Sequence, residues 1–223
     1  MNPNVVHGTL ERRRCICKTA CASVFAMFLL LMQGAEGAEG TESNHTGSPW
    51  AASKAASTKC AIKFREVEEF GKNPDPKKQK TTRFSEDEIN SYIVLELKPK
   101  FSPGLKRLQL GFKEDSLQVE ADIDFDTFND KSTRLSEKLL ASIMSGVHTL
   151  TATGRLHAKA GKAYFELVEA RLDKHVLPTI LVEQIISEVG RRQKPPFDPL
   201  QPSQMPYNIK SVDVHTGMII IYQ

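Results

Sequence analysis

From Phe84 onward, hydrophobic and polar residues follow regular patterns that predict helices and strands in turn. Ser85 and Glu88 fit a capping box, in which the serine side chain accepts a hydrogen bond from a helix amide and the glutamate bonds back to the serine amide. Apolar residues then recur at helical spacing at Ile89, Tyr92, Ile93 and Leu97. We therefore expect a helix that begins after Ser85 and ends before Pro99.

The period changes to two after this helix. Apolar residues alternate with polar ones in two runs, 105–112 and 117–126, which are separated by Glu114-Asp115-Ser116. Strict alternation on both sides of a tight turn predicts an antiparallel hairpin with one apolar and one polar face.

A second hairpin is predicted over residues 148–173, with less regular alternation. In its second strand, Phe165 and Leu167 point to one face, whereas Val168 and Leu172 point to the other. We therefore expect apolar cover on both faces of this hairpin.

Two further helices and a third hairpin complete the pattern. Apolar residues recur at helical spacing over 134–144 and again, as a broad stripe, over 178–193. The proline-rich stretch 195–206 is expected to be extended and unable to pair in a sheet. The last hairpin is predicted over 209–222. Hairpins and helices without βαβ alternation predict the α+β class.

The first 37 residues are expected to be a secretory signal peptide rather than part of the fold. Basic residues at 12–18 precede an uncharged apolar run, 20–32, and Ala35-Glu36-Gly37 then fits a small-x-small cleavage site. The apolar run is shorter than the roughly 20 residues that span a bilayer as a helix. An uncleaved amphipathic anchor is the alternative. We expect export to the periplasm or the extracellular space of a bacterium.

The rest of the chain is expected to have three parts. Residues 38–60 are small and polar and predict a flexible leader. Residues 61–83 predict a linker or irregular segment, in which 61–70 could form a short strand or helix, and residues 84–223 predict one α+β domain. Cys60 is the only cysteine after residue 37, so no internal disulfide is expected. The chain carries 30 Lys and Arg against 27 Asp and Glu, a net charge of +3, which is too weak to indicate a nucleic-acid partner.

No pattern indicates catalysis, a cofactor or a metal. The sequence lacks a nucleophile elbow, a glycine-rich phosphate loop, an HExxH pair and a CxxC pair. Asp122, Asp124 and Asp126 have the spacing that begins a calcium loop, but Thr127 and Thr133 stand where that loop needs glycine and glutamate. We therefore interpret the aspartates as the polar face of a strand.

Basic residues close the late helix at Arg191, Arg192 and Lys194. The helix dipole favours cations at this end. Contact with an anionic headgroup is the alternative interpretation.

The order of these elements resembles that of small bacterial exported proteins of the tubular lipid-binding (TULIP-like) type. The resemblance covers residues 84–222 and rests on the segments RFSEDEINSYI, RLQLGFKEDSLQVEADIDF, TGRLHAKAGKAYFELVEARLDKHVLP, PTILVEQIISEV and MPYNIKSVDVHTGMIIIY. It implies a curved antiparallel β-sheet of hairpins wrapped around one or two long helices, with a lipid in an apolar groove between them. It supplies no catalytic residue.

Our leading hypothesis is an exported, non-enzymatic protein that binds a lipid or another apolar or amphiphilic small molecule. Each buried methylene of such a ligand contributes about 0.8 kcal/mol, so binding needs no conspicuous motif. Peripheral contact with a membrane is compatible with this function. The side chains expected to line the groove are Ile89, Ile93, Phe165, Leu167, Leu181, Ile185, Ile186, Val189 and Ile220.

Two other functions stay open. The protein could be an envelope scaffold that binds a protein partner, with the apolar strand at 218–222 pairing with the edge of another sheet. An enzyme is the third possibility, and it requires a cleft in which carboxylates or histidines gather.

Overall fold

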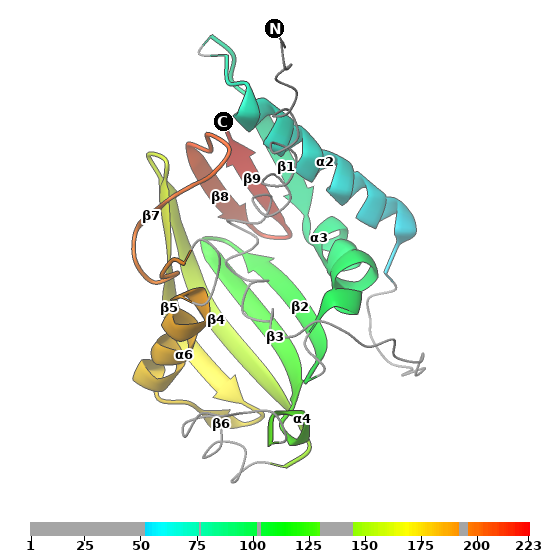
Figure 1. Ribbon diagram of the computed structural model, residues 1–223, viewed down its shortest axis with the longest axis vertical. Helices are drawn as coiled ribbons and strands as arrows, with labels where there is room; N and C mark the ends of the chain where they lie inside the picture. The colour runs from blue at the N-terminus through cyan, green and yellow to red at the C-terminus, as the bar shows by residue number, and fades with distance from the viewer. Residues whose placement is uncertain (1–51, 76, 102–103, 130–144, 192–195) are drawn as a thin grey trace, which may run out of the picture.

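The computed structural model describes residues 52–75, 77–101, 104–129, 145–191 and 196–223, except for the side chains of residues 100, 128, 129, 188 and 189. The fold is α+β, with a few helices and two antiparallel sheets (Figure 1). The helices are α2 (Lys54–Lys72), α3 (Glu86–Tyr92), α4 (Asp126–Asn129) and α6 (Thr179–Arg191), and α3 continues as a π-helical turn (Ile93–Leu97) and a 3-10 turn (Lys98–Lys100). The strands are β1 (Thr81–Ser85), β2 (Leu105–Lys113), β3 (Ser116–Asp124), β4 (Val147–Lys159), β5 (Lys162–Leu172), β6 (His175–Val176), β7 (Ser203–Gln204), β8 (Ser211–His215) and β9 (Met218–Tyr222).

The large sheet is open and has the order β2-β3-β4-β5-β6, and β7 also pairs with β5. The small sheet has three strands in the order β1-β9-β8. It is joined to the turn ends of both large hairpins, because Asp115 N–H donates to the Val214 carbonyl and Gly161 N–H donates to the Lys210 carbonyl. All three predicted hairpins and the capping box of α3 are confirmed. The helix expected over 134–144 lies outside the described residues.

Before Phe84 the described chain forms a longer helix than expected, which includes the short helix considered for 61–70 and extends back into the expected leader. Part of the expected leader and the first half of the expected linker form α2, whose N-cap Ser53 accepts a hydrogen bond from Ala56 N–H. Ser57 and Cys60 of α2 are fully buried. Alanine and serine gave this segment the composition of a flexible leader. Alanine, however, has the highest helix propensity, and small side chains allow two helices to pack closely. Here they let α2 pack against α3.

The expected two-sided apolarity of the second hairpin was also wrong. Thr153 pairs with Glu169 and Gly154 with Leu167, so Val168 is an extra residue at a β-bulge. The bulge shifts the alternation by one residue. Leu172 is therefore buried, as Leu167 is, whereas Val168 is 49% exposed.

The proline-rich segment does contribute to a sheet, contrary to expectation. Ser203 pairs with Ala163 and Gln204 with Lys162, and these two residues of β7 lie between prolines at 202 and 206. A strand of this length fits between the prolines because neither proline has to donate to the ladder.

Two clusters of buried side chains form the core. The first lies between β2, β3, the small sheet, α2 and α3, and it includes Phe84, Ile89 and Phe112. The second lies between β5 and α6, and it includes Phe165 and Val182. In Figure 1, α6 lies by β5, whereas α2 and α3 lie at the other side of the molecule.

Side chains of α3 close the outer edge of β2. The Asn90 amide donates to the Leu110 carbonyl over 2.8 Å and accepts from the Leu110 N–H over 2.9 Å. The Glu86 carboxylate accepts from Phe112 N–H, and Gly217 N–H donates to the Phe112 carbonyl. An unpaired edge strand is a template for association with another strand. These contacts remove that template at Leu110 and Phe112.

Candidate binding surfaces

The side chains expected to line one groove lie in separate places. Ile89 and Ile93 are 0% and 1% exposed and belong to the first cluster. Phe165 and Leu167 belong to the second cluster. Ile220 is buried in β9 and belongs to neither cluster. A side chain that water cannot reach contacts protein on all sides, so a ligand at Ile89 would have to displace protein atoms.

The late helix is different, because it buries only part of its apolar stripe. Val182 is buried against β5 and Ile186 packs against the same cluster. Leu181 is half-buried and Ile185 is 42% exposed. Val189 lies in α6, but its side chain is outside the described residues.

Two exposed residues in this region were missing from our prediction. Val176 of β6 is 61% exposed and Ile180 of α6 is 70% exposed. The signal was present in the sequence, because apolar residues at 180, 181, 185 and 186 cover more of the helix circumference than one sheet contact can bury. Whether an apolar position is buried depends on the packing of the helix, and the stripe alone does not reveal it.

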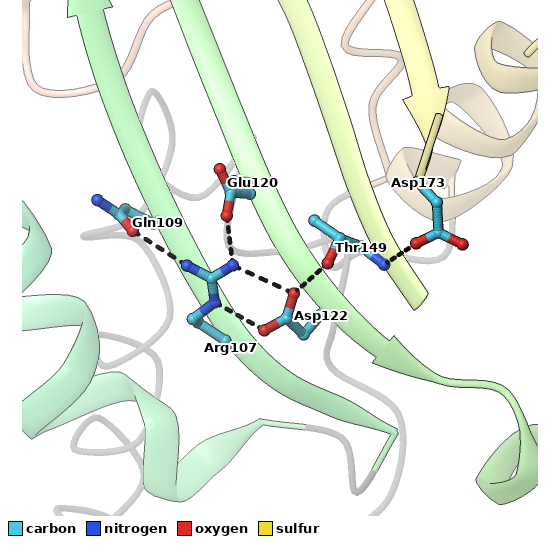
Figure 2. A network of polar contacts seen from close by, with 6 residues as sticks. All are labelled: Arg107, Gln109, Glu120, Asp122, Thr149 and Asp173. Carbon is cyan, nitrogen blue, oxygen red and sulfur yellow. Dashed lines mark hydrogen bonds and ion pairs between the residues drawn. The ribbon is translucent and has the colours of Figure 1, made fainter. Parts of the chain in front are cut away.

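The outer face of the large sheet carries a network of paired charges around Arg107. Arg107 of β2 donates to Asp122 and Glu120 of β3 and to the Gln109 side chain (Figure 2). Asp122 also accepts from the Thr149 hydroxyl over 2.8 Å. Partial burial acts to raise the pKa of Asp122, but the hydrogen bonds from Arg107 and Thr149 outweigh it and lower the pKa below 3.8.

These pairs explain the aspartate spacing that resembles a calcium loop. Asp122 binds Arg107, and Asp124 forms an ion pair with Lys106 at 3.0 Å. Carboxylates that are already neutralised by cations lack the negative charge that Ca²⁺ needs. In the described part of the chain, no group of His, Cys, Asp or Glu side chains could hold a metal ion. The interpretation as a strand face is confirmed for Asp122 and Asp124, whereas it was wrong for Asp126, which begins α4.

A shallow hollow of about 250 Å³ lies on the same sheet beside α3. Its side chains are mostly polar and include Glu86, Gln109, Lys113 and Gln118. Gly111 lacks a side chain and leaves the hollow open between them. Its lining differs from that of the expected apolar groove.

His148 lies at the start of β4 and makes two polar contacts. Its Nδ1 is 2.6 Å from the Asp173 carboxylate, and its Nε2 is 3.0 Å from the Ser145 carbonyl. The hydrogen bond to Asp173 raises the pKa of His148 above 6.5, and the same bond lowers the pKa of Asp173 below 3.8.

The last strand does not have the free edge that the scaffold alternative required. Every residue of β9 from Met218 to Tyr222 pairs with β1 on one side and β8 on the other. At the end of α6, Arg191 lies 3.7 Å from Asp198, whereas Arg192 and Lys194 lie outside the described residues. No helix in the described ranges combines the length and the apolar character required to cross a membrane.

Comparison with models of known protein families, with curated proteins and with solved structures finds no match to this chain.

Proposed function

We propose that this protein is a non-enzymatic binding protein that attaches to anionic lipid surfaces through an apolar edge formed by Val176, Ile180, Leu181 and Ile185. This proposal keeps the expected lipid or amphiphile as the partner and the expected export from the cell. It places contact with the lipid on the exposed side of α6. The finer expectation, a curved sheet wrapped around helices with a lipid inside, would need Phe165 and Leu167 to leave a packed cluster.

One observation carries the proposal. Among the described residues, nine large hydrophobic side chains are exposed, and three of them fall between Val176 and Ile185. Singly exposed hydrophobic residues are ordinary, but several on one short segment indicate an interaction site. Helices with apolar residues left outside the core are one way in which proteins bind the surface of a membrane.

The charge next to this edge favours an anionic partner. Lys174 and His175 directly precede Val176 and are exposed. Lys174 forms no ion pair within the described part of the chain. A lysine near an anionic membrane surface contributes about 1 kcal/mol to attachment.

The expected attachment is weak. Burying a whole isoleucine side chain contributes about 1.5–3 kcal/mol. Ile180 is 70% exposed and Ile185 42% exposed, so with Val176 they offer about 3 kcal/mol when they enter the interface. With the contribution of Lys174, the total corresponds to reversible peripheral contact with the membrane.

The test is cosedimentation of the full chain with vesicles of phosphatidylcholine and phosphatidylglycerol. We expect Ile180→Gln to weaken binding about tenfold, because about 1.4 kcal/mol corresponds to a factor of ten. Ile62→Gln is the matched control, since Ile62 is an isoleucine on α2 that is 47% exposed. Lys174→Gln should weaken binding to these vesicles and leave binding to pure phosphatidylcholine unchanged.

Equal loss of binding in the Ile180 and Ile62 variants would contradict the assignment of the edge. Absence of binding by the unaltered chain would overturn the lipid proposal. A stoichiometric protein crosslinked to position 180 would then favour the interaction module.

A further inference from the structure

His148 contacts two groups that can only accept hydrogen bonds. Asp173 presents a carboxylate to Nδ1 and Ser145 presents a backbone carbonyl to Nε2. A neutral imidazole carries one N–H and one lone pair, whereas the imidazolium carries two N–H groups. Only the charged ring therefore satisfies both contacts at once.

The neutral ring has two forms with unequal contacts. With the proton on Nδ1, the bond to Asp173 remains and the Nε2 lone pair faces the Ser145 carbonyl. With the proton on Nε2, the Nδ1 lone pair faces a negative carboxylate, which is the less favourable arrangement. Loss of the proton should therefore break the contact with Ser145 and keep the contact with Asp173.

Within the described ranges, the other groups near His148 include two carboxylates, a second histidine and an aromatic ring. Asp126 of α4 lies close enough to favour the imidazolium, and its carboxylate accepts from Gly146 N–H over 3.0 Å. Asp124 at the end of β3 is paired with Lys106. His175 of β6 interacts electrostatically with Asp173. The ring of Phe125 meets the His148 ring edge-on, at 5.6 Å between centroids.

The two segments that His148 joins are far apart in the sequence. Ser145 precedes β4, and Asp173 lies in the turn between β5 and β6. Asp173 is held independently of His148, because its carboxylate accepts from Thr149 N–H and its own N–H donates to the Thr149 carbonyl. Of the two acceptors of His148, only the Ser145 carbonyl therefore loses its hydrogen bond with the second N–H, while the neighbouring Gly146 stays bonded to Asp126 and Phe125.

We propose that His148 is a proton-operated bridge, in which the imidazolium ties Ser145 to the β5–β6 turn and the neutral ring releases Ser145. The bridge forms in the pH range in which Asp173 is ionised and His148 is protonated. Its contribution is complete below the pKa of an unfolded histidine and is lost as the pH rises through the raised pKa of His148. The bridge is independent of the proposed lipid attachment.

The experiment uses the full chain and two NMR readouts. The ring nitrogen shifts of His148 should show both nitrogens protonated at mildly acidic pH and only Nδ1 protonated at alkaline pH. Amide exchange at Gly146 and Val147, corrected for its intrinsic pH dependence, should rise about fivefold across the same titration.

Two variants separate the bridge from a general effect of pH. An asparagine side chain places its amide near the Nδ1 position, so His148→Asn should keep the Asp173 bond and show the raised exchange at every pH. His157→Gln is the control, because His157 is also on β4 and contacts one carboxylate, Glu166, at 2.6 Å through Nε2. The His157→Gln variant should show the same pH course of amide exchange at Gly146 as the unaltered chain.

The proposal is overturned if Nε2 stays protonated while Nδ1 loses its proton. It is also overturned if exchange at Gly146 follows the same pH course in His148→Asn as in the unaltered chain.

Discussion

Replacing Asn90 with alanine should strongly destabilise the fold, because this side chain takes the place of a neighbouring strand. Asn90 is 5% exposed and its amide bonds to both the N–H and the carbonyl of Leu110. Leu110 is itself 6% exposed, so water can replace these two bonds only in part. A buried polar group without a partner costs about 1–3 kcal/mol, and Asn90→Ala leaves two of them. We expect a loss of about 2–4 kcal/mol in the free energy of unfolding.

The assay is urea unfolding followed by circular dichroism. With a slope of about 1–3 kcal/mol per molar urea, the midpoint should fall by about 1–2 M. Asn73→Ala is the matched control, since Asn73 is exposed and follows α2 as its C-cap. A shift at Asn90 no larger than that at Asn73 would refute the argument that the amide closes the strand edge.

A second substitution tests the geometry of the two bonds. Asn90→Asp keeps an acceptor for the Leu110 N–H but places a carboxylate oxygen beside the Leu110 carbonyl. The protonated carboxyl restores the missing donor. The variant should therefore gain stability relative to the unaltered chain as the pH falls toward 4, about the ordinary pKa of an aspartate. A destabilisation that does not change with pH would mean that the amide does not face Leu110 as described.

Three further predictions concern packing, reactivity and capping. Gly154→Ala should lower the free energy of unfolding by about 1–3 kcal/mol, because a Cβ there would lie 2.2 Å from the Phe165 ring. Gly111→Ala is the control, since its Cβ would meet nothing nearer than 3.6 Å, and equal shifts of the two thermal unfolding midpoints would contradict the prediction. Cys60 is fully buried, and burial raises its pKa to about 12. A thiol reagent should therefore modify it only when the chain unfolds, and rapid labelling of the native protein would contradict this. Ser85→Ala removes the N-cap of α3 and should lower stability by about 1 kcal/mol in the same urea assay, and an unchanged midpoint would show that the capping box contributes nothing.

Local signals in the sequence predicted the elements that local contacts determine. The capping box at Ser85 and the alternation on both sides of Asp115 each lie within a few residues, and both appear in the structure as expected. The pairing of β1 with β9 joins residues at opposite ends of the domain. No periodicity can reveal such a pairing, so the separate small sheet was not predicted.

The errors have equally physical causes. At Val168 one extra residue reverses the inward and outward positions of the rest of β5, and a single sequence offers no marker for a bulge at that position. The first turns of α2, before residue 61, were assigned to a flexible leader because alanine and serine are common both in flexible segments and in closely packed helices. The candidate site was predicted only in part, since an apolar stripe shows that Ile180 and Ile185 belong to a helix but does not show which of them the sheet covers.

The rest of the described surface makes the apolar edge at α6 stand out. On the outer face of the large sheet, Arg107 compensates Asp122 and Glu120, and at its edge Asn90 satisfies the Leu110 backbone. A chain that pairs its charges and closes its strand edges in this way avoids unintended association at those places. The same chain leaves Ile180 70% exposed two residues before the buried Val182, on a helix that follows Lys174, which has no ion pair within the described ranges. A polar residue at position 180 would cost the fold little, because the side chain buries little surface in the folded protein. Under the proposed function, the isoleucine at this position supplies contact with the lipid surface rather than stability to the core.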